Sequence, residues 1–377
     1  MAALESLDAF IHFGCWNYDK CGGNNAVTAV TRAVKQETDS HRIKYVIVAG
    51  DNYYPIKNKK NGAKEKLINP SMLASGFDCL PDIQTYVLFG NHDLDNSDSL
   101  RLYSGDGTVK DMANSPDNSA AEPCTIMNME LSHVKTKPKL IFPPSDIVTH
   151  RIDGNTMILM IDTTMYDISD ADKDGNMVCY NQYYNESNLV KLIERQNRAI
   201  KEILLSYLAD HITNIMFVGH HPLLYPKVKK NDNGETDLKI SYLRDLALFF
   251  KEIYAMYPTR NYFYLCADYH NYQQGTVILG DMHVEQYIVG TGGTKLDDPL
   301  TDYLPADGGL TEVIKTINPI QTDDGSAYVI KYEIKAYGYL RVTLADAPIF
   351  EFVQVSLSGG TRRKRARKRT RKRIHKR

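Results

Sequence analysis

The sequence is poor in cysteine, and its few cysteines follow no pattern. The six are Cys15, Cys21, Cys79, Cys124, Cys179 and Cys266, spread over 377 residues. They form no C-x-x-C pair and lack the dense, regular spacing of small disulfide-rich domains. We therefore expect six free thiols in a reducing compartment, and an intracellular protein of the cytoplasm or the nucleus.

Long apolar runs are also missing. The amino-terminal stretch "MAALESLDAF" has neither the positively charged start nor the long apolar segment of an export signal. No later segment approaches the ~20 apolar residues that a membrane helix needs, and no internal repeat is visible. Since 43% of the residues are hydrophobic, we expect a globular protein. The missing apolar segments lead us to expect that it is not secreted and has no transmembrane segment.

Acidic residues are absent from residues 362–377. This stretch holds 12 of the 45 lysines and arginines, so the rest of the chain has 33 basic and 46 acidic residues and a net charge of −13. We interpret residues 358–377 as a disordered basic tail. Such a charge block either only solubilises the chain or binds a polyanion non-specifically: nucleic acid, acidic lipid headgroups or an import receptor. The second reading would place the protein in a nucleic-acid-containing assembly.

The sequence does contain an alternation of short apolar runs and longer amphipathic ones, which predicts strands interleaved with helices. Apolar residues recur at helical spacing over 187–208, where Ser187 can cap the start, and over 241–256. Apolar runs that end at glycine or a polar residue predict strands at 8–14, 44–49, 84–89, 156–162, 214–218 and 262–266. This order indicates an α/β fold.

Three regions depart from that alternation. After residue 284, alternating segments rich in Tyr, Val and Ile predict a late antiparallel sheet. The polar stretch 94–135 predicts a surface insertion made of loops. Residues 170–176, "DADKDGN", imitate the start of a calcium-binding loop, but Asn181 stands where the bidentate glutamate belongs. We interpret this third region as an acidic turn.

Polar side chains follow four of the predicted strands, at the point where each strand ends. "GDNYYP" follows 44–49, "GNHD" follows 84–89, "GHHP" follows 214–218 and "ADYHNYQ" follows 262–266. Because the carboxyl ends of strands in an open α/β sheet converge on one crevice, these oxygen and nitrogen donors should meet there. A lone histidine often only packs, whereas four such clusters together predict a metal site.

These motifs resemble those of the calcineurin-like metallophosphoesterases, and among them the purple acid phosphatases. The family's motifs are GDxG, GDNxY, GNH(D/E), GHxP and GHxHNxQ, and the chain reads "GCWN", "GDNYY", "GNHD", "GHHP" and "ADYHNYQ" in that order. The resemblance runs from Phe10 to Val355. It implies one α/β domain over residues 1–357: a two-sheet sandwich flanked by helices, with a dinuclear metal site at the carboxyl ends of the strands.

The resemblance also implies the ligands, position by position. The first metal would be bound by Cys15, Asp51, Tyr54 and His270. The second would be bound by Asp51, Asn91, His220 and Asp268. Asp51 follows a tight turn after Gly50 and is the only acid placed to reach two ions ~3.5–4 Å apart.

The implied reaction is hydrolysis of a phosphorylated substrate. A hydroxide activated by two iron, zinc or manganese ions would attack a phosphomonoester, with phosphodiesters less favoured. Asp51 would be catalytic as the shared ligand. His92 would lie outside the metals as the second catalytic residue, where it can bind the phosphate or protonate the leaving alkoxide.

Two positions depart from the family pattern, because Cys15 replaces an aspartate and Asp268 a histidine. A carboxylate can replace an imidazole on Zn²⁺, Mn²⁺ or Fe²⁺. For Cys15 two readings stay open, since a thiolate binds zinc or iron and a free cysteine is commonly a small buried hydrophobe. "HFG" at 12–14 offers His12 as a second-ranked ligand, and a nucleophilic Cys15 is disfavoured because no basic phosphate loop follows it.

The same departures support an alternative function. The chain would then be a catalytically weakened member of the family that acts as a binding or structural component. Its basic tail would direct it to nucleic acid or to an assembly.

Overall fold

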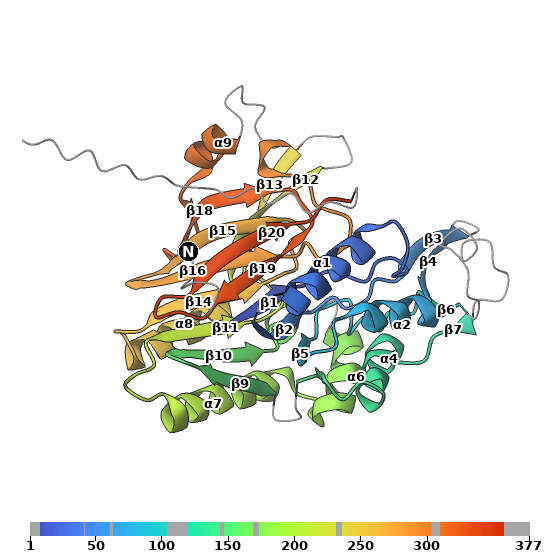
Figure 1. Ribbon diagram of the computed structural model, residues 1–377, viewed down its shortest axis with the longest axis horizontal. Coiled ribbons are helices and arrows are strands. Elements are labelled where there is room, and N and C mark those ends of the chain that lie inside the picture. The colour runs from blue at the N-terminus through green and yellow to red at the C-terminus, as the bar shows by residue number, and fades with distance from the viewer. Residues whose placement is uncertain are drawn as a thin grey trace, which may run out of the picture.

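The computed structural model of the protein describes residues 8–40, 42–60, 63–103, 119–143, 147–168, 173–230, 236–302 and 310–357. Two large β-sheets pack face to face, with helices on their outer sides (Figure 1). The predicted α/β two-sheet sandwich flanked by helices is therefore confirmed.

The first sheet has six strands in the order β20-β19-β1-β2-β5-β8. Its four parallel strands are β1 (Ala9–Phe13), β2 (Ile43–Ala49), β5 (Thr85–Leu88) and β8 (Leu140–Ile141). Two antiparallel strands, β19 (Gly338–Thr343) and β20 (Ile349–Gln354), extend it beyond β1. Residues 10–13 and 45–49 are buried without alternation, as expected for parallel strands covered on both faces.

The helices of this half begin at side-chain caps. In α1 (Ala26–Ser40), Val27, Val30 and Val34 are buried at helical spacing, and Asn25 Oδ1 accepts a hydrogen bond from the amide of Thr28 at 2.9 Å. In α2 (Pro70–Cys79), Asn69 caps the amides of residues 71 and 72, and proline occupies the first turn. These helices connect the parallel strands that deliver the "GCWN", "GDNYY" and "GNHD" motifs.

The second sheet has eight strands in the order β17-β18-β15-β16-β14-β11-β10-β9. Its bounds are β9 Val148–Asp153, β10 Thr156–Ile161, β11 Asn214–Val218, β14 Asn261–Cys266, β15 Tyr272–Leu279, β16 Met282–Val289, β17 Ile320–Gln321 and β18 Ala327–Ile334. Strands β10, β11, β14 and β16 run parallel. All six strands predicted from apolar runs are therefore present, within two residues of the expected bounds.

Aromatic side chains fill the space between the two sheets. Tyr287 of β16 stacks on Phe350 of β20 with ring centroids 4.1 Å apart, and Tyr272 of β15 stacks on Phe352 at 4.2 Å. Each such ring buries apolar area worth about 1.5–3 kcal/mol of transfer free energy. This packing joins β15 and β16 of the second sheet to β20 of the first.

Helices α7 (Leu189–Tyr207) and α8 (Arg244–Met256) cover the second sheet and confirm the two predicted helices. Phe250 of α8 stacks on Phe217 of β11 at 4.2 Å. The predicted cap of the first helix was wrong: Asn188, not Ser187, accepts a hydrogen bond from the amide of Lys191. Asparagine is as good a cap as serine, and it stands one residue closer to the first turn.

The prediction of one late antiparallel sheet was also wrong. Strands β15, β16, β17 and β18 extend the second sheet, whereas β19 and β20 extend the first. Strand β16 is antiparallel to β15 but parallel to β14. An alternating pattern identifies a strand, but it does not say which neighbour the strand pairs with.

Smaller elements surround the sandwich. A four-stranded sheet contains β3 (Ile56–Lys60), β4 (Ala63–Ile68), β6 (Leu100–Leu102) and β7 (Ser119–Ala120), and a hairpin contains β12 (Leu224–Lys230) and β13 (Thr236–Tyr242). The other helices of the described residues are α4 (Thr125–Ser132), α5 (Thr164–Asp167), α6 (Lys173–Tyr184), α9 (Leu310–Ile317) and the 3₁₀ turns His133–Lys135 and Leu300–Asp302.

The segment 94–135 is not simply a surface insertion of loops. Leu94, Leu100, Ile126 and Met127 are buried in the main core, and the segment supplies β6, β7 and α4. Its apolar residues are few but stand at core-facing positions, which overall composition does not reveal. Residues 104–118 lie outside the described part of the chain, as do residues 170–172 of the predicted acidic turn; Lys173 begins α6.

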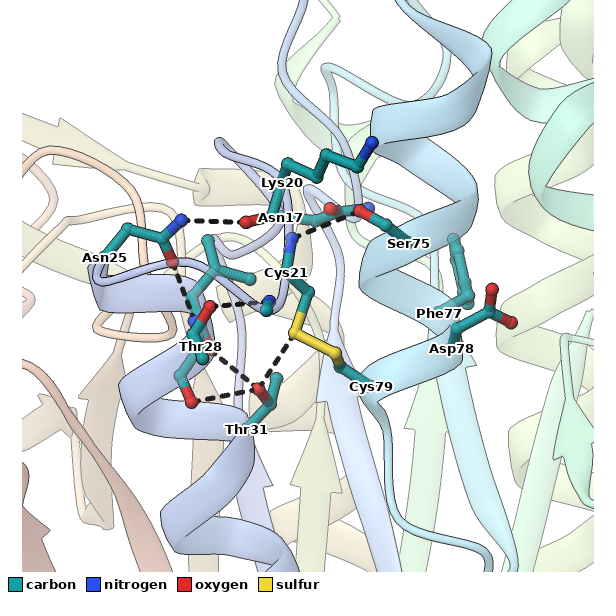
Figure 2. The surroundings of a disulfide bond; sticks show 12 residues. Asn17, Lys20, Cys21, Asn25, Thr28, Thr31, Ser75, Phe77, Asp78 and Cys79 are labelled. Atoms are coloured by element: carbon teal, nitrogen blue, oxygen red, sulfur yellow. Dashed lines mark hydrogen bonds between the residues drawn. A yellow bond between two sulfur atoms is a disulfide. The ribbon is translucent and has the colours of Figure 1, made fainter. Parts of the chain in front are cut away.

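Four of the six cysteines form disulfides, so the prediction of six free thiols was wrong. Cys21 is bonded to Cys79 at the end of α2, and Cys124 to Cys179 of α6, across 58 and 55 residues of sequence. Figure 2 shows the first bond between the loop that precedes α1 and helix α2. Disulfides persist in oxidising compartments, so the thiol argument for a cytoplasmic or nuclear location no longer holds. Cys15 and Cys266 are free and buried.

No helix in the described part of the chain is both long enough and apolar enough to cross a membrane. The basic tail, residues 358–377, lies outside the described residues.

Candidate metal centre

Three of the predicted site residues sit on sharp turns at strand ends. Cys15, Asp51 and Asp268 have φ angles of 52°, 51° and 53°, in the left-handed region that ordinary residues rarely adopt. Such conformations cost about 1–3 kcal/mol each and concentrate at functional sites. The amide of Cys15 donates to the carbonyl of Gly50 at 3.1 Å, which joins the first two turns directly.

Gly90 lets the third motif approach the second. A Cβ atom at this position would lie 2.3 Å from Asp51 Oδ1 and 2.4 Å from the Asp51 amide. Only glycine fits at this distance. As a result, the amide of His92 donates to Asp51 Oδ1 at 3.1 Å.

The four residues predicted for the first metal come together. Tyr54 Oη donates to Asp51 Oδ2 at 2.7 Å and lies 3.2 Å from His270 Nε2. Donor atoms of Cys15, Asp51 and His270 all lie within 4.8 Å of one another. The other ring nitrogen of His270 lies 3.0 Å from the carbonyl of Lys295, which fixes the ring with Nε2 toward Tyr54.

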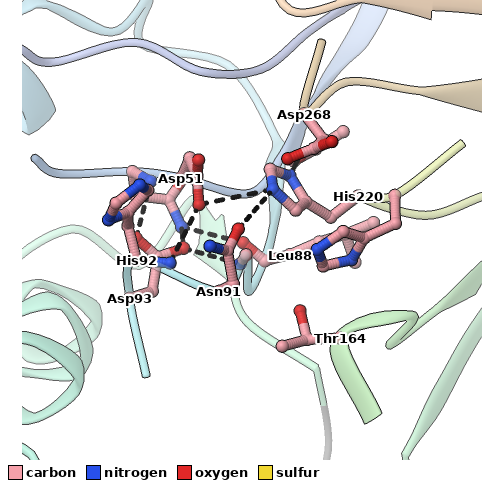
Figure 3. A network of polar contacts seen from close by, with 12 residues as sticks. Asp51, Leu88, Asn91, His92, Asp93, Thr164, His220 and Asp268 are labelled. Atoms are coloured by element: carbon pink, nitrogen blue, oxygen red, sulfur yellow. Dashed lines mark hydrogen bonds and ion pairs between the residues drawn. The ribbon is translucent and has the colours of Figure 1, made fainter. Parts of the chain in front are cut away.

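The second group forms around His220. Its Nε2 atom lies 3.3 Å from Asp51 Oδ1 and 3.3 Å from Asn91 Oδ1, as Figure 3 shows. Its Nδ1 atom lies 2.6 Å from the carbonyl of Ala49, so Nε2 is the nitrogen that would bind a metal once the ring is neutral. Asp51 therefore presents one carboxylate oxygen to each group.

Asp268 belongs to the second group, together with a residue absent from the predicted ligand set. Donor atoms of His220, His221 and Asp268 lie within 4.8 Å of one another. Asp268 Oδ2 also accepts a hydrogen bond from Tyr225 Oη of β12 at 2.5 Å. The doubled histidine of "GHHP" was the available signal for His221, but the family pattern uses only the first of the two.

His12, the alternative ligand, lies elsewhere. It is fully buried in β1, and its Nε2 atom lies 3.1 Å from the carbonyl of Cys266. It belongs to neither donor group found among the described residues. The structure therefore gives no support to the register that would use His12.

His92 lines a cleft of about 220 Å³ next to the donor groups. Lys66 and Asn91 also line it, and Lys66 Nζ lies 2.5 Å from Asp95 Oδ2. The His92 ring lies against Tyr54, with ring centroids 4.8 Å apart. A larger cavity of about 680 Å³ surrounds the Cys21–Cys79 disulfide and shares no lining residue with this cleft.

Electrostatics favour cations at this centre. Burial alone would raise the pKa of Asp51, but the charges of His220 and His92 outweigh burial and lower that pKa. Burial and the negative charges of Asp51 and Asp268 raise the pKa of the Cys15 thiol, so the thiol is protonated when no cation is near. A neighbouring cation reverses this balance and deprotonates a coordinating thiol.

The residues present fit two metal ions. They offer a shared carboxylate, two oriented imidazoles, an amide oxygen, a second carboxylate and a buried sulfur. Both ring nitrogens of the buried His221 lack a hydrogen-bond partner. A donor set of this mixed N, O and S character suits zinc or iron better than magnesium or calcium.

Comparisons with solved structures give similar proteins of low identity. A purple acid phosphatase, PPD1 from seeds of yellow lupin (Lupinus luteus), is 14% identical with a TM-score of 0.47, over 95% of this chain and 52% of that one. GAP50, described as the anchor in the inner membrane complex of Plasmodium, is 12% identical with a TM-score of 0.46, over 92% and 84%. PhoD is 12% identical with a TM-score of 0.47, over 94% and 67%.

This chain thus spans about half the length of the lupin phosphatase. No curated protein matches the sequence. The sequence profile of the calcineurin-like phosphoesterases matches residues 9–250, which is well over half of the chain and contains the "GCWN", "GDNYY", "GNHD" and "GHHP" motifs. The chain therefore belongs to the calcineurin-like phosphoesterase family.

Proposed function

We propose that the protein is a metal-dependent phosphoesterase that hydrolyses phosphomonoesters. The observation that carries this proposal is the position of Asp51. Its Oδ2 atom faces Tyr54 and the first donor group, and its Oδ1 atom faces His220 and Asn91 of the second. A carboxylate shared between two donor groups is the arrangement that a two-metal hydrolytic site requires.

Each group of the chain then has a definite task. When bound, two metal ions supply a water of lowered pKa and positive charge for the phosphate oxygens. Asp51 would hold both ions, and the Ala49 and Lys295 carbonyls orient His220 and His270. The substrate occupies the cleft lined by His92 and Lys66, where His92 binds the phosphate or protonates the leaving oxygen.

The donor set bears on the choice of metal. The first ion would be held by Cys15, Asp51, Tyr54 and His270, and a thiolate favours zinc or iron over manganese. The second would be held by Asp51, Asn91, His220 and Asp268. Tyr225 donates to one oxygen of Asp268, and this hydrogen bond fixes the carboxylate as a ligand, as outer-shell partners do in metal sites.

A second candidate function rests on the same two unusual positions. Without a cation, burial and neighbouring charges keep the Cys15 thiol protonated, and Asp268 stands where the family pattern has a histidine. If these positions do not bind metal, the chain is a weakened family member that serves as a binding or structural component. The basic tail would then direct it to a polyanion such as nucleic acid.

Metal analysis coupled to turnover separates the two candidates. Purified protein, loaded in turn with zinc, iron or manganese, should contain two ions per chain and hydrolyse p-nitrophenyl phosphate. Bis-p-nitrophenyl phosphate, a diester, should be turned over more slowly. A protein that binds fewer than two ions and turns over neither substrate under any metal or pH would support the non-catalytic candidate.

A further inference from the structure

We infer that His221 is a ligand of the second metal, and that it supplies the imidazole which the family places at position 268. This inference rests on the proposed function. Donor atoms of His221, His220 and Asp268 lie within 4.8 Å of one another, although His221 stands outside the family's ligand pattern. Compared with the family pattern, this chain would have a carboxylate ligand at position 268 in place of a histidine, and an additional histidine ligand at position 221.

The backbone around His221 is held in place independently of its ring. The amides of His220 and His221 both donate to Thr163 Oγ1 at 2.9 Å. The carbonyl of His221 accepts a hydrogen bond from Tyr264 Oη at 2.5 Å. The ring packs edge-on against His220, with centroids 4.6 Å apart, so both imidazoles project from one rigid turn.

The ring itself has no hydrogen-bond partner. His221 is 4% exposed, and neither Nδ1 nor Nε2 makes a hydrogen bond. Leaving a buried polar group unsatisfied costs about 1–3 kcal/mol, so such a group calls for a ligand. Of its two nitrogens, Nε2 lies 3.4 Å from Asp167 Oδ2, a carboxylate that could orient the ring as outer-shell carboxylates orient metal-bound histidines.

The resulting donor set is chemically coherent. With His221, the second metal would have five donors: Asp51, Asn91, His220, His221 and Asp268. Two of them are imidazoles, which is the number that the family pattern gives this metal. His221 therefore restores the nitrogen ligand lost at position 268 and keeps the site suited to zinc or iron.

Zinc titration calorimetry on two variants and one control tests the assignment. His221→Phe keeps a ring against His220 but removes both nitrogens, and His221→Ala removes the ring. The control is His211→Ala, because His211 is exposed and belongs to neither donor group. We expect wild type and control to bind two zinc ions. Both His221 variants should keep the first and bind the second at least about tenfold more weakly, since outer-shell partners alone are worth 10–100-fold.

A rescue distinguishes a ligand from a packing residue. Adding Asp268→His to His221→Phe returns an imidazole to the family's position and should restore the second affinity to within about threefold of wild type. A residue that only packs would not be rescued in this way. Unchanged zinc affinity in both single variants would overturn the inference while leaving the proposed function intact.

X-ray absorption on the zinc-loaded wild-type protein needs no variant. The assignment predicts three imidazoles over the two ions, from His220, His221 and His270, whereas two would overturn it. A wild-type protein that takes up no second zinc ion would contradict the proposed function and this inference together.

Discussion

At the scale of single residues, two of the proposed ligands, Cys15 and Tyr54, hold their protons when no cation is near. Burial and the charges of Asp51 and Asp268 raise the pKa of Cys15, and burial with Asp51 and Cys15 raises that of Tyr54. Cys15 also packs against Ala49, Tyr54 and Ala267, so its position serves both readings of the sequence. The contacts of Cys15 are compatible with a metal ligand and with a packing residue, and substitution of Cys15 distinguishes the two.

If Cys15 binds the first metal, Cys15→Asp restores the family's ligand and should strengthen metal binding or raise turnover. Cys15→Ala should lower the affinity for the first metal by about tenfold or more, because even outer-shell contacts have effects of that size. In the wild type, the thiol should resist alkylation until the metal is chelated. Metal content and turnover that are unchanged in both variants would show that Cys15 only packs.

His92→Ala should slow turnover by about 10²–10⁴ and leave both metals bound, because His92 lines the cleft, where we propose that it binds the phosphate or protonates the leaving group. Steady-state kinetics with p-nitrophenyl phosphate and metal analysis measure the two effects separately. His211→Ala is the matched control on the surface. Loss of a metal from the His92 variant would instead make His92 a ligand.

The sequence predicts that the donor side chains of these motifs meet, because each motif follows a strand end, and the structure places them together; that Asp51 is shared between two metals stays a prediction. The sequence does not predict that His221 lies beside the other donors, since the directions of two adjacent histidine side chains depend on the conformation of the turn that carries them. Here Thr163, from a segment 57 residues earlier than His220, accepts hydrogen bonds from both amides and sets that turn. Long-range contacts of this kind have no local signature.

At the scale of elements, the periodic helices and the buried strands agree with prediction. The pairing of the late strands and the two disulfides do not. The two disulfides join segments that are distant in the sequence: one joins the loop before α1 to α2, and the other joins Cys124, the residue before α4, to α6. The Cα atoms of the bonded pairs are 6.4 and 5.4 Å apart, within the range that disulfides need. No sequence spacing indicates these pairs, because the fold brings them together.

Denatured, unreduced protein should therefore contain two free thiols, Cys15 and Cys266, out of six cysteines. The double variant Cys124→Ser/Cys179→Ser should lose about 2–4 kcal/mol of unfolding free energy, since closing a long loop restricts the unfolded chain. Thiol titration and urea unfolding measure these quantities, with reduced wild type as the control. Six titratable thiols in the unreduced protein would contradict the disulfide assignment.

At the scale of the whole molecule, charge is divided between an acidic body and the basic stretch 362–377. The metal centre lies among the described residues and the basic stretch outside them, so the two can be tested separately. The charge of the stretch is read directly from composition, and its binding to a polyanion stays a prediction.

Deleting residues 362–377 should leave turnover of p-nitrophenyl phosphate unchanged and remove salt-sensitive binding to heparin, nucleic acid and anionic vesicles. Elution from heparin with increasing salt compares the two proteins directly. Elution of the truncated and full-length chains at the same salt concentration would show that the tail does not bind polyanions.

The central claim, a two-metal phosphoesterase site built on Asp51, is tested most directly by Asp51→Asn. Asparagine tolerates the left-handed backbone at this position and keeps the size of the side chain, so the fold should survive. Metal content and kcat are measured on the same preparation as the wild type. We predict the loss of at least one of two metal ions and of nearly all hydrolysis; a variant with two metals and near-normal kcat would contradict the account.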